Sequence, residues 1–384
     1  MGCDWMNKPL SPEMEGYLRE NRQALLDLIT ELCKIPAPSH QEGNRARFCK
    51  DYLEAAGARG VYIDEAQNCV YPYRCEGEGE IAVVMAHMDT VFPDLEPMPL
   101  RMEAGRLYSP GVGDDTANLA MLLLLAGYVA RSEPNPELGV LFVCNTGEEG
   151  LGNLVGCRQI MKDYGSRVRE LISIDGTYDS VSNHCVGSNR YRVEIRTEGG
   201  HSYGAFGNRN AIRYLASMID TLYTVKVPEG GKTTYNVGMI GGGTSVNTIA
   251  AQAEMLYEFR SDHRPSLEYM EQFFTSVVET YRRMGITVNV ELLGQRPCMG
   301  EVDPQRQAAL SERCRSAIAR YYKDPPFRSA STDCNIPCSM GIPAVTFGGY
   351  LGGGAHTREE YIELDSLEAG FQIVATVVMD YFCS

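Results

Sequence analysis

Histidine and carboxylate side chains stand at the ends of several strongly apolar segments of this chain. The residues concerned, in chain order, are His87 and Asp89, Asp114 and Asp115, Glu148 and Glu149, Asp175, and His356. Most of them follow short apolar runs that read as buried strands, and the carboxyl ends of parallel strands meet at one edge of a sheet. Imidazole together with carboxylate is the ligand set of catalytic zinc sites. The pattern therefore predicts a metal centre at that edge.

Taken singly, each of these residues has an ordinary structural explanation. Asp114 or Asp115 could cap the helix that follows, since a carboxylate is favourable at a helix N-terminus. Glu148 and Glu149 could be a solvated pair in a loop, and Asp175 could be a turn residue. Because these explanations would have to hold at five strand or helix ends together, the joint pattern favours metal.

The number of ligands suits two ions that share one bridging residue. His87 and His356 offer neutral nitrogens, Glu149 and Asp175 offer terminal carboxylates, and one aspartate can span both ions. We expect two Zn²⁺ per subunit, with Co²⁺ or Mn²⁺ also compatible with these ligand types.

Two further carboxylates have roles beside the ligands. Asp89 can hold the ring N–H of His87 and so fix the tautomer of the imidazole. Glu148 diverges from its neighbour Glu149, so that one side chain can bind metal while the other faces a bridging water as general base.

The elements that must position these side chains are strands alternating with helices. Continuous apolar strands at 81–86, 140–144, 171–174 and 343–347 predict an α/β domain with helices on both faces of the sheet. Between the third and the fourth strand, the order β-α-β-β-α-β with one polar strand face is that of a ferredoxin-like unit. We expect a catalytic domain at 1–188 plus 297–384 and an inserted α+β lid domain at 189–296. Helical spacing also predicts one helical stretch from residue 12 until Pro36.

Composition excludes several classes of partner. The chain has 384 residues and a formal net charge of −15, so its average surface would repel nucleic acid and anionic membranes. No apolar run approaches the length of a membrane span. The 13 cysteines do not have zinc-finger spacing, and the sequence does not start like a secretory leader. Both observations favour reduced thiols in a cytoplasmic protein. GVGDDT lacks the third glycine of a dinucleotide fingerprint.

The motifs that carry this chemistry resemble a known family. The segments are HMDTVFP, GVGDDTAN, NTGEEG, SIDG and the late GGGAHT. In order and spacing they resemble the co-catalytic zinc hydrolases that include peptidase T, aminoacylase, acetylornithine deacetylase and glutamate carboxypeptidase. Between them, GGHSYGAFGNRNAI and GGGTSVNTIAAQAEMLYEFRS are similar to the lid motifs of that family. The resemblance runs from about Pro36 to the end of the chain.

Residue by residue, the resemblance implies a complete site. The implied metal ligands are His87, Asp114, Glu149, Asp175 and His356. Asp114 is the implied bridge, Asp115 is implied to follow a cis peptide bond, and the implied catalytic residues are Asp89, Glu148 and His201. Glu148 acts as the base, and His201 steadies the oxyanion. Asn247 and Arg260 resemble residues that hold the carbonyl and the carboxylate of the substrate; a surface ion pair is the ordinary alternative for Arg260.

The resemblance implies a hydrolase of amide bonds in short peptides, assembled as a homodimer through the lid. Asp175, rather than the longer Glu, favours a di- or tripeptide aminopeptidase. Deacylation of an N-acyl amino acid and carboxypeptidase activity are the alternatives within the same chemistry. Thr116 and Ala117 stand where many members have Lys and Gly, which leaves metal binding intact but the substrate open. A non-catalytic binding protein is the remote alternative, because neither a ligand nor Glu148 is missing.

Overall fold

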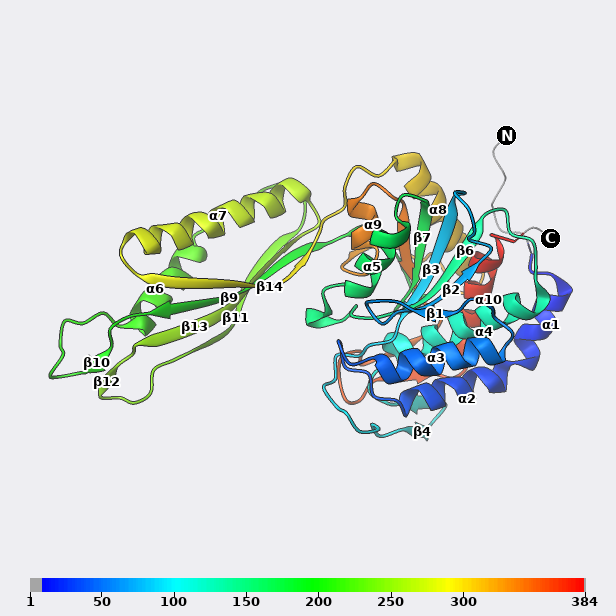
Figure 1. Cartoon of the computed structure of the whole chain (residues 1–384), viewed down its shortest axis with the longest axis horizontal. Coiled ribbons are helices and arrows are strands. Elements are labelled where there is room, and N and C mark those ends of the chain that lie inside the picture. Colours follow the sequence, from blue (N-terminus) through cyan, green and yellow to red (C-terminus); the bar gives the residue numbers. More distant parts are fainter. Residues whose placement is uncertain (1–8, 383–384) are drawn as a thin grey trace. The chain divides into compact units, whose positions relative to one another are not determined.

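The computed structural model describes residues 9–382. The chain divides into two compact units, one formed by Met1–Cys185 with Glu301–Ser384 and the other by Val186–Gly300. The inserted unit is thus a few residues wider at each end than the predicted insertion at 189–296. Figure 1 shows both units in ribbon form.

The first unit is built on an eight-stranded mixed sheet, which confirms the predicted α/β class. In spatial order the strands are β1 (Tyr62–Ile63), β2 (Cys69–Tyr73), β6 (Gly139–Asn145), β3 (Ile81–His87), β7 (Val168–Ile174), β16 (Ala344–Phe347), β8 (Val181–Cys185) and β15 (Phe327–Ala330). The four central strands β6, β3, β7 and β16 run parallel to their neighbours in this group. Every residue of β3 and β6 is buried, as expected of strands covered on both faces.

Helices cover the sheet (Figure 1). The longer helices of this unit are α1 (Pro12–Glu20), α2 (Arg22–Cys33), α3 (Gly43–Ala55), α4 (Asn118–Ser132), α8 (Pro304–Ile318) and α10 (Ser366–Met379). Side chains of α4 and α10 share one hydrophobic core with Ala82, Val84 and Ala86 of β3. The shorter helices α5 (Val155–Tyr164) and α9 (Asn335–Ser339) pack against each other. The stretch predicted as one helix from residue 12 is two helices, which meet at Asn21.

Short elements near the ends of the central strands complete this unit. They are η1 (Val112–Ala117), η2 (Gly150–Gly152) and the small sheet β17 (Gly352–Gly353), β18 (Tyr361–Glu363), β5 (Arg106–Tyr108) and β4 (Arg101–Glu103). η1 directly precedes α4, which is buried from Asn118 to Ala130. The apolar helix therefore anchors the loop that carries Asp114.

The second unit is an antiparallel sheet with two helices on one face, in the predicted order. The strands in spatial order are β11 (Thr233–Gly242), β13 (Gln252–Ser261), β9 (Gly187–Arg196) and β14 (Thr287–Arg296). Tyr191, Val193 and Ile195 of β9 point into a core with α6 (Ala211–Leu222) and α7 (Arg264–Arg283). A two-stranded pair, β10 (Gly200–His201) and β12 (Thr248–Ile249), extends one end of this sheet.

No helix within residues 9–382 is both long enough and apolar enough to cross a bilayer.

Candidate metal centre

Strand ends and adjoining loops of the first unit bring the five predicted ligands together. His87 is the last residue of β3, Asp175 follows β7 directly, and Glu149 lies in the loop after β6. These three strands are parallel neighbours, so their carboxyl ends meet at one edge of the sheet. Asp114 comes from η1 and His356 from the loop between β17 and β18.

Ligand atoms within this set fall into two groups that share Asp114. One atom from each of His87, Asp114 and Asp175 lies within 4.8 Å of the others, and the same holds for Asp114, Glu149 and His356. Nε2 of His87 is 3.0 Å from Oδ1 of Asp114, and Nε2 of His356 is 3.1 Å from Oδ2 of Asp114. The two oxygens of Asp114 thus face one imidazole each, as those of a carboxylate bridging two ions would.

The hydrogen bonding of His87 indicates that a cation belongs between these groups. Its Nδ1 lies 3.0 Å from the backbone carbonyl of Asp89. A carbonyl only accepts, so Nδ1 carries the proton in the neutral ring and Nε2 turns its lone pair toward Asp114. Two lone pairs at this separation need a proton or a metal ion between them. Ligand atoms about 2.0–2.2 Å from one zinc ion lie ~3 Å apart, close to the separations found here.

Glu149 fits the same explanation. Its Oε1 is buried and has no hydrogen-bond partner, although it lies 3.1 Å from Nε2 of His356. A buried carboxylate oxygen without a donor is costly unless a cation satisfies it. The donor set therefore fits a pair of divalent metal ions.

Burial and neighbouring charged groups shift the pKa values of several residues at this site. Burial raises the pKa of Asp175 to about 7, and the nearby Asp114 carboxylate adds to this effect. The contact with Asp114, together with the neighbouring Glu149 carboxylate, raises the pKa of His356 to about 10. Burial disfavours the charged form of Asp114, but its contacts with His356 and His87 bring its pKa below the usual range. Bound cations would relieve this crowding of carboxylates.

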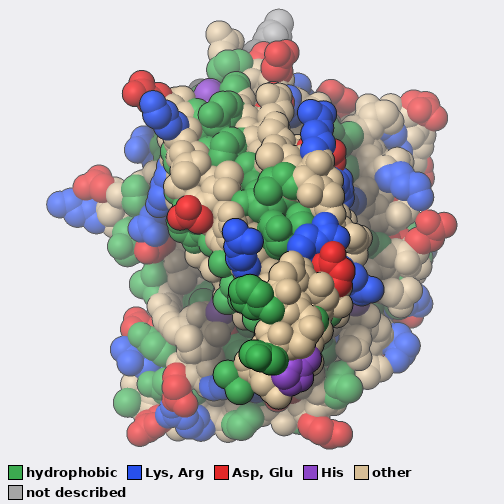
Figure 2. Space-filling view, turned by 90° about the vertical axis from the view of Figure 1, so that its left-hand side faces the viewer, with side chains coloured by type: hydrophobic (Ala, Val, Ile, Leu, Met, Phe, Trp, Pro, Cys, Tyr) green, Lys and Arg blue, Asp and Glu red, His purple; other side chains and the backbone are tan. Residues whose placement is uncertain are grey.

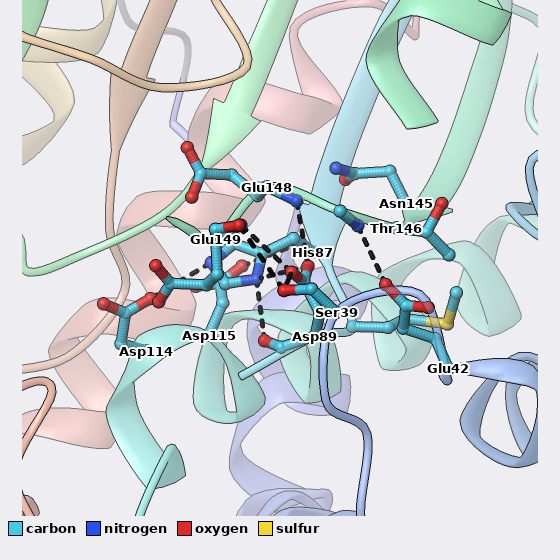
Figure 3. A network of polar contacts seen from close by, with 12 residues as sticks. Ser39, Glu42, His87, Asp89, Asp114, Asp115, Asn145, Thr146, Glu148 and Glu149 are labelled. Atoms are coloured by element: carbon cyan, nitrogen blue, oxygen red, sulfur yellow. Dashed lines mark hydrogen bonds and ion pairs between the residues drawn. The ribbon is translucent and has the colours of Figure 1, made fainter. Parts of the chain in front are cut away.

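Asp89 positions the loop that carries Glu148 and Glu149, as Figure 3 shows. Its Oδ1 accepts the amide of Glu148 and its Oδ2 that of Glu149, both at 3.0 Å. Ser39 donates its hydroxyl to Oδ2 at 2.6 Å. The ring of His87 is held mainly by the backbone of Asp89, because Nδ1 is 3.4 Å from the carboxylate Oδ1. The carboxylate thus orients the predicted base and a predicted ligand more directly than it orients the imidazole.

Asp115 stands behind the ligands rather than among them. The Asp114–Asp115 peptide bond is cis, as the resemblance implied. Oδ2 of Asp115 accepts the backbone amide of His87 at 3.0 Å, and Oδ1 accepts the side-chain amide of Asn118 at 2.6 Å. These contacts tie the end of β3 to the start of α4.

The three remaining predicted residues, His201, Asn247 and Arg260, lie in the second unit. His201 is on β10, and its Nδ1 accepts the amides of Tyr203 and Gly204 at 3.3 Å each. In the neutral ring the proton is then on Nε2, which makes Nε2 a hydrogen-bond donor. Asn247 precedes β12 at the same end of the sheet, where its carbonyl accepts the amide of Ser202 at 2.9 Å.

Arg260 occupies the opposite end of that sheet. It is the ninth residue of β13, nearly the full length of the strand away from the pair β10–β12. Its Nε and Nη2 donate to the two carboxylate oxygens of Glu258 at 3.2 and 3.1 Å. The ion pair that was its ordinary alternative is therefore present, on a side chain that is 39% exposed.

A family model described as "Peptidase family M20/M25/M40" matches residues 83–380. The chain belongs to this family. It is accordingly a metal-dependent hydrolase, as the ligand geometry indicates.

Relatives in the M20/M25/M40 family span nearly the whole chain. A succinyl-diaminopimelate desuccinylase from Corynebacterium glutamicum is 26% identical over 358 residues, which cover 88% of this chain and 92% of that protein. A tripeptidase from Staphylococcus aureus has a TM-score of 0.75 at 23% identity, covering 93% of this chain and 98% of that one. The aminopeptidase PepT from Bacillus cereus has a TM-score of 0.71 at 20% identity, covering 94% and 99%. The solved structures establish the common fold.

Glu360 is the most prominent residue of this M20 site that sequence reasoning missed. It is 2% exposed, and its carboxylate accepts three backbone amides at 2.8 Å each, those of Gly111, Gly113 and Asp114. A Cβ on Gly113 would lie 2.5 Å from the hydroxyl oxygen of Tyr350, so this loop has room only for glycine there. Glu360 thus fixes the backbone of Asp114. Its position four residues after His356 was the only available signal.

Two further missed residues hold the loop after β6. The amide of Thr146 donates to Oδ1 of Asn68, and that of Gly147 donates to Oε1 of Glu42, both at 3.0 Å. With the two bonds to Asp89, four successive amides of this loop are held by side chains from other elements. Nε2 of His40 lies 3.3 Å from the carbonyl of Leu151, in the short helix η2 that follows.

Proposed function

We propose that this protein is an aminopeptidase that removes the first residue of di- and tripeptides with two zinc ions per subunit. The observation that carries the proposal is Asp114, each of whose oxygens faces one imidazole. His87, Asp114 and Asp175 would hold one ion, and Asp114, Glu149 and His356 the other. Co²⁺ and Mn²⁺ are the other ions that suit these ligands.

Glu148 is the proposed base and proton shuttle. One carboxylate oxygen of Glu148 lies within 4.8 Å of ligand atoms of His87 and Glu149. Metal ions held by these residues would supply Lewis acidity, which would polarise the scissile carbonyl and lower the pKa of a water molecule at the site. Glu148 would accept a proton from the attacking water and pass it to the leaving amine.

His201 is the proposed donor to the oxyanion. Its Nδ1 is occupied by two backbone amides, so Nε2–H is the donor that the ring presents. A donor fixed in this way stabilises negative charge as it develops on the substrate oxygen without reorganising. Asn247, at the same end of the sheet, would bind the substrate carbonyl, and Arg260 would bind the terminal carboxylate through its guanidinium fork.

The separation of His201 from Arg260 supports a site built from two copies of the chain. From Gln252 to Arg260 the strand β13 extends ~26 Å, and His201 lies beyond its other end. A fully extended tripeptide spans only ~10 Å. If His201 and Arg260 both contact one short peptide, they come from different subunits. We therefore propose a homodimer in which the second unit acts as lid and dimerisation domain and His201 acts in trans.

Two observations support release of an N-terminal residue: Asp175, and the tripeptidase and PepT among the structural neighbours. The alternative is deacylation of an N-acyl amino acid, which the desuccinylase among the relatives favours; carboxypeptidase activity is the third possibility. A cytoplasmic location suits the cysteines of residues 9–382, which are buried thiols.

A panel of tripeptides with free or acetylated N-termini tests the proposal. We expect cleavage to require the free amine and to release the first residue, measured by mass spectrometry of the products. Release of acetate, or of the C-terminal residue from acetylated peptides, would overturn the aminopeptidase assignment and support the alternatives.

A further inference from the structure

Three bulky apolar side chains stand almost entirely in solvent at the end of the second unit. Tyr203 is 90% exposed, Phe206 91% and Val246 103%. Every other large apolar side chain that is exposed among the described residues of this unit reaches at most 58%. Figure 2 looks onto the side where β10 and β12 lie in Figure 1 and shows hydrophobic side chains beside a histidine at the surface.

These three residues belong to the two loops that carry His201 and Asn247. β10 and β12 pair with each other, and the amide of Ser202 donates to the carbonyl of Asn247 at 2.9 Å. Tyr203 follows Ser202 in the chain and Val246 precedes Asn247, so their backbones flank this hydrogen bond. The amide of Ala205 donates to the carbonyl of His201 at 2.8 Å, which closes a tight turn just before Phe206.

The same contacts couple the apolar residues to the proposed oxyanion donor. The amide of Tyr203 is one of the two that hold the ring of His201. His201 therefore belongs to the same pair of hydrogen-bonded loops as Tyr203, Phe206 and Val246. Exposed apolar surface of this kind is removed from water when a binding partner covers it.

We propose that Tyr203, Phe206 and Val246 bind an apolar side chain of the substrate beside the scissile bond. The inference rests on the proposed function, because it takes His201 and Asn247 to act on the substrate. It adds the substrate class: short peptides with a bulky apolar residue next to the bond that is cut.

The test compares tripeptides that carry leucine or alanine on either side of the scissile bond. Wild-type protein should cleave the leucine peptides with the higher kcat/KM. Tyr203→Ala, Phe206→Ala and Val246→Ala should each lower the ratio of kcat/KM for leucine over alanine peptides, by about tenfold for the largest effect. Tyr269→Ala on α7, a side chain that is 43% exposed, is the matched control and should leave the ratio unchanged.

The outcomes separate the inference from the proposed function. If the wild type cleaves peptides and the ratio stays constant in all three variants, the apolar contact is wrong and the proposed function stands. If kcat/KM falls equally for both peptides while sedimentation shows a loss of dimer, these side chains contact the partner subunit and the inference is overturned. If the metal-loaded wild type cleaves no peptide at all, the proposed function fails, and this inference fails with it.

Discussion

Among the single residues, Asp114 and Glu148 divide the chemistry between them. Asp114 faces both imidazoles, so it belongs to both ligand groups. Glu148 belongs to neither group and lies near one candidate ligand of each, His87 and Glu149. The proposed roles, metal binding for Asp114 and proton transfer for Glu148, can therefore be tested independently.

Replacing Glu148 by glutamine should abolish turnover and leave the metal centre intact. The amide keeps the shape of the side chain but accepts no proton, so kcat should fall by about 10²–10⁴-fold. Metal content measured by plasma mass spectrometry should remain that of the wild type. Glu149→Gln is the matched comparison, because it should reduce metal content as well. Turnover by Glu148→Gln at the wild-type rate would show that another group is the base.

Glu360→Gln should weaken metal binding without touching a ligand. Glutamine offers one carbonyl oxygen where the carboxylate now accepts three amides, so the loop of Asp114 loses part of its support. Removing support of this kind typically costs 10–100-fold in affinity, and we expect the Kd for Zn²⁺ to rise by about tenfold. Titration calorimetry on the chelated protein measures it. Glu359→Gln, an exposed neighbour, should bind as the wild type does; an unchanged Kd for Glu360→Gln would exclude the role.

The residue types explain why sequence reasoning pointed to the candidate ligands and missed Glu360, Glu42 and Asn68. Candidate metal ligands can be recognised from residue type and position alone, since His and Asp at the ends of strands suit metal binding. Glu360 and Glu42 act on backbone amides of loops distant in sequence, and which amides they meet depends on the path of those loops. Asp89 was predicted from its spacing to His87, but its main contacts, the amides of Glu148 and Glu149, required the fold.

Of the structural elements, the loop after β6 positions Glu148, the proposed base. Its amides have no strand partners at the sheet edge, and buried amides must be satisfied. Asn68, Glu42 and Asp89 accept four of them in sequence. The loop is therefore held by side chains rather than by regular structure.

Asp89→Asn should destabilise this loop and the protein with it. An amide nitrogen would face one of the two backbone N–H groups that the carboxylate now accepts, and a buried donor would lose its partner. The expected cost is about 1–3 kcal/mol in the free energy of unfolding, measured by urea denaturation of the chelated protein. Asp94→Asn, whose side chain pairs with Arg358 nearer the surface, should change stability by less. Equal stability of both variants would contradict the holding role of Asp89.

The strands and helices were largely predictable from hydrophobic patterning, and the exceptions have a local cause. Leu18 and Leu25 continue one helical spacing across Asn21, so the break between α1 and α2 left no trace in the pattern. The strands β10 and β12 have two residues each, which is too few to show any periodicity in the sequence. Their pairing nevertheless brings His201 beside Thr248.

For the molecule as a whole, the separation of His201 from Arg260 along one sheet makes subunit exchange the informative experiment. His201→Ala and Glu148→Gln subunits should each be nearly inactive alone. In a mixed dimer, the site with an intact Glu148 receives an intact His201 from its partner. Random mixing should therefore restore about a quarter of the wild-type activity, since half of the dimers are mixed and each has one complete site.

Activity that stays at the level of the separate variants after verified subunit exchange would contradict action in trans. The control is a mixture of Glu148→Gln with Glu149→Gln subunits, whose substitutions both lie in the first unit. Those two changes should not complement each other, because one site needs both residues from the same chain.

The central claim is that catalysis depends on two metal ions shared through Asp114, and metal titration tests it most directly. The chelated protein should be folded and inactive toward free tripeptides. Addition of Zn²⁺, Co²⁺ or Mn²⁺ should restore cleavage, with full activity at two equivalents per chain, and Asp114→Asn should fail to recover at any stoichiometry. Peptide cleavage by protein that elemental analysis shows to be free of metal would contradict the account.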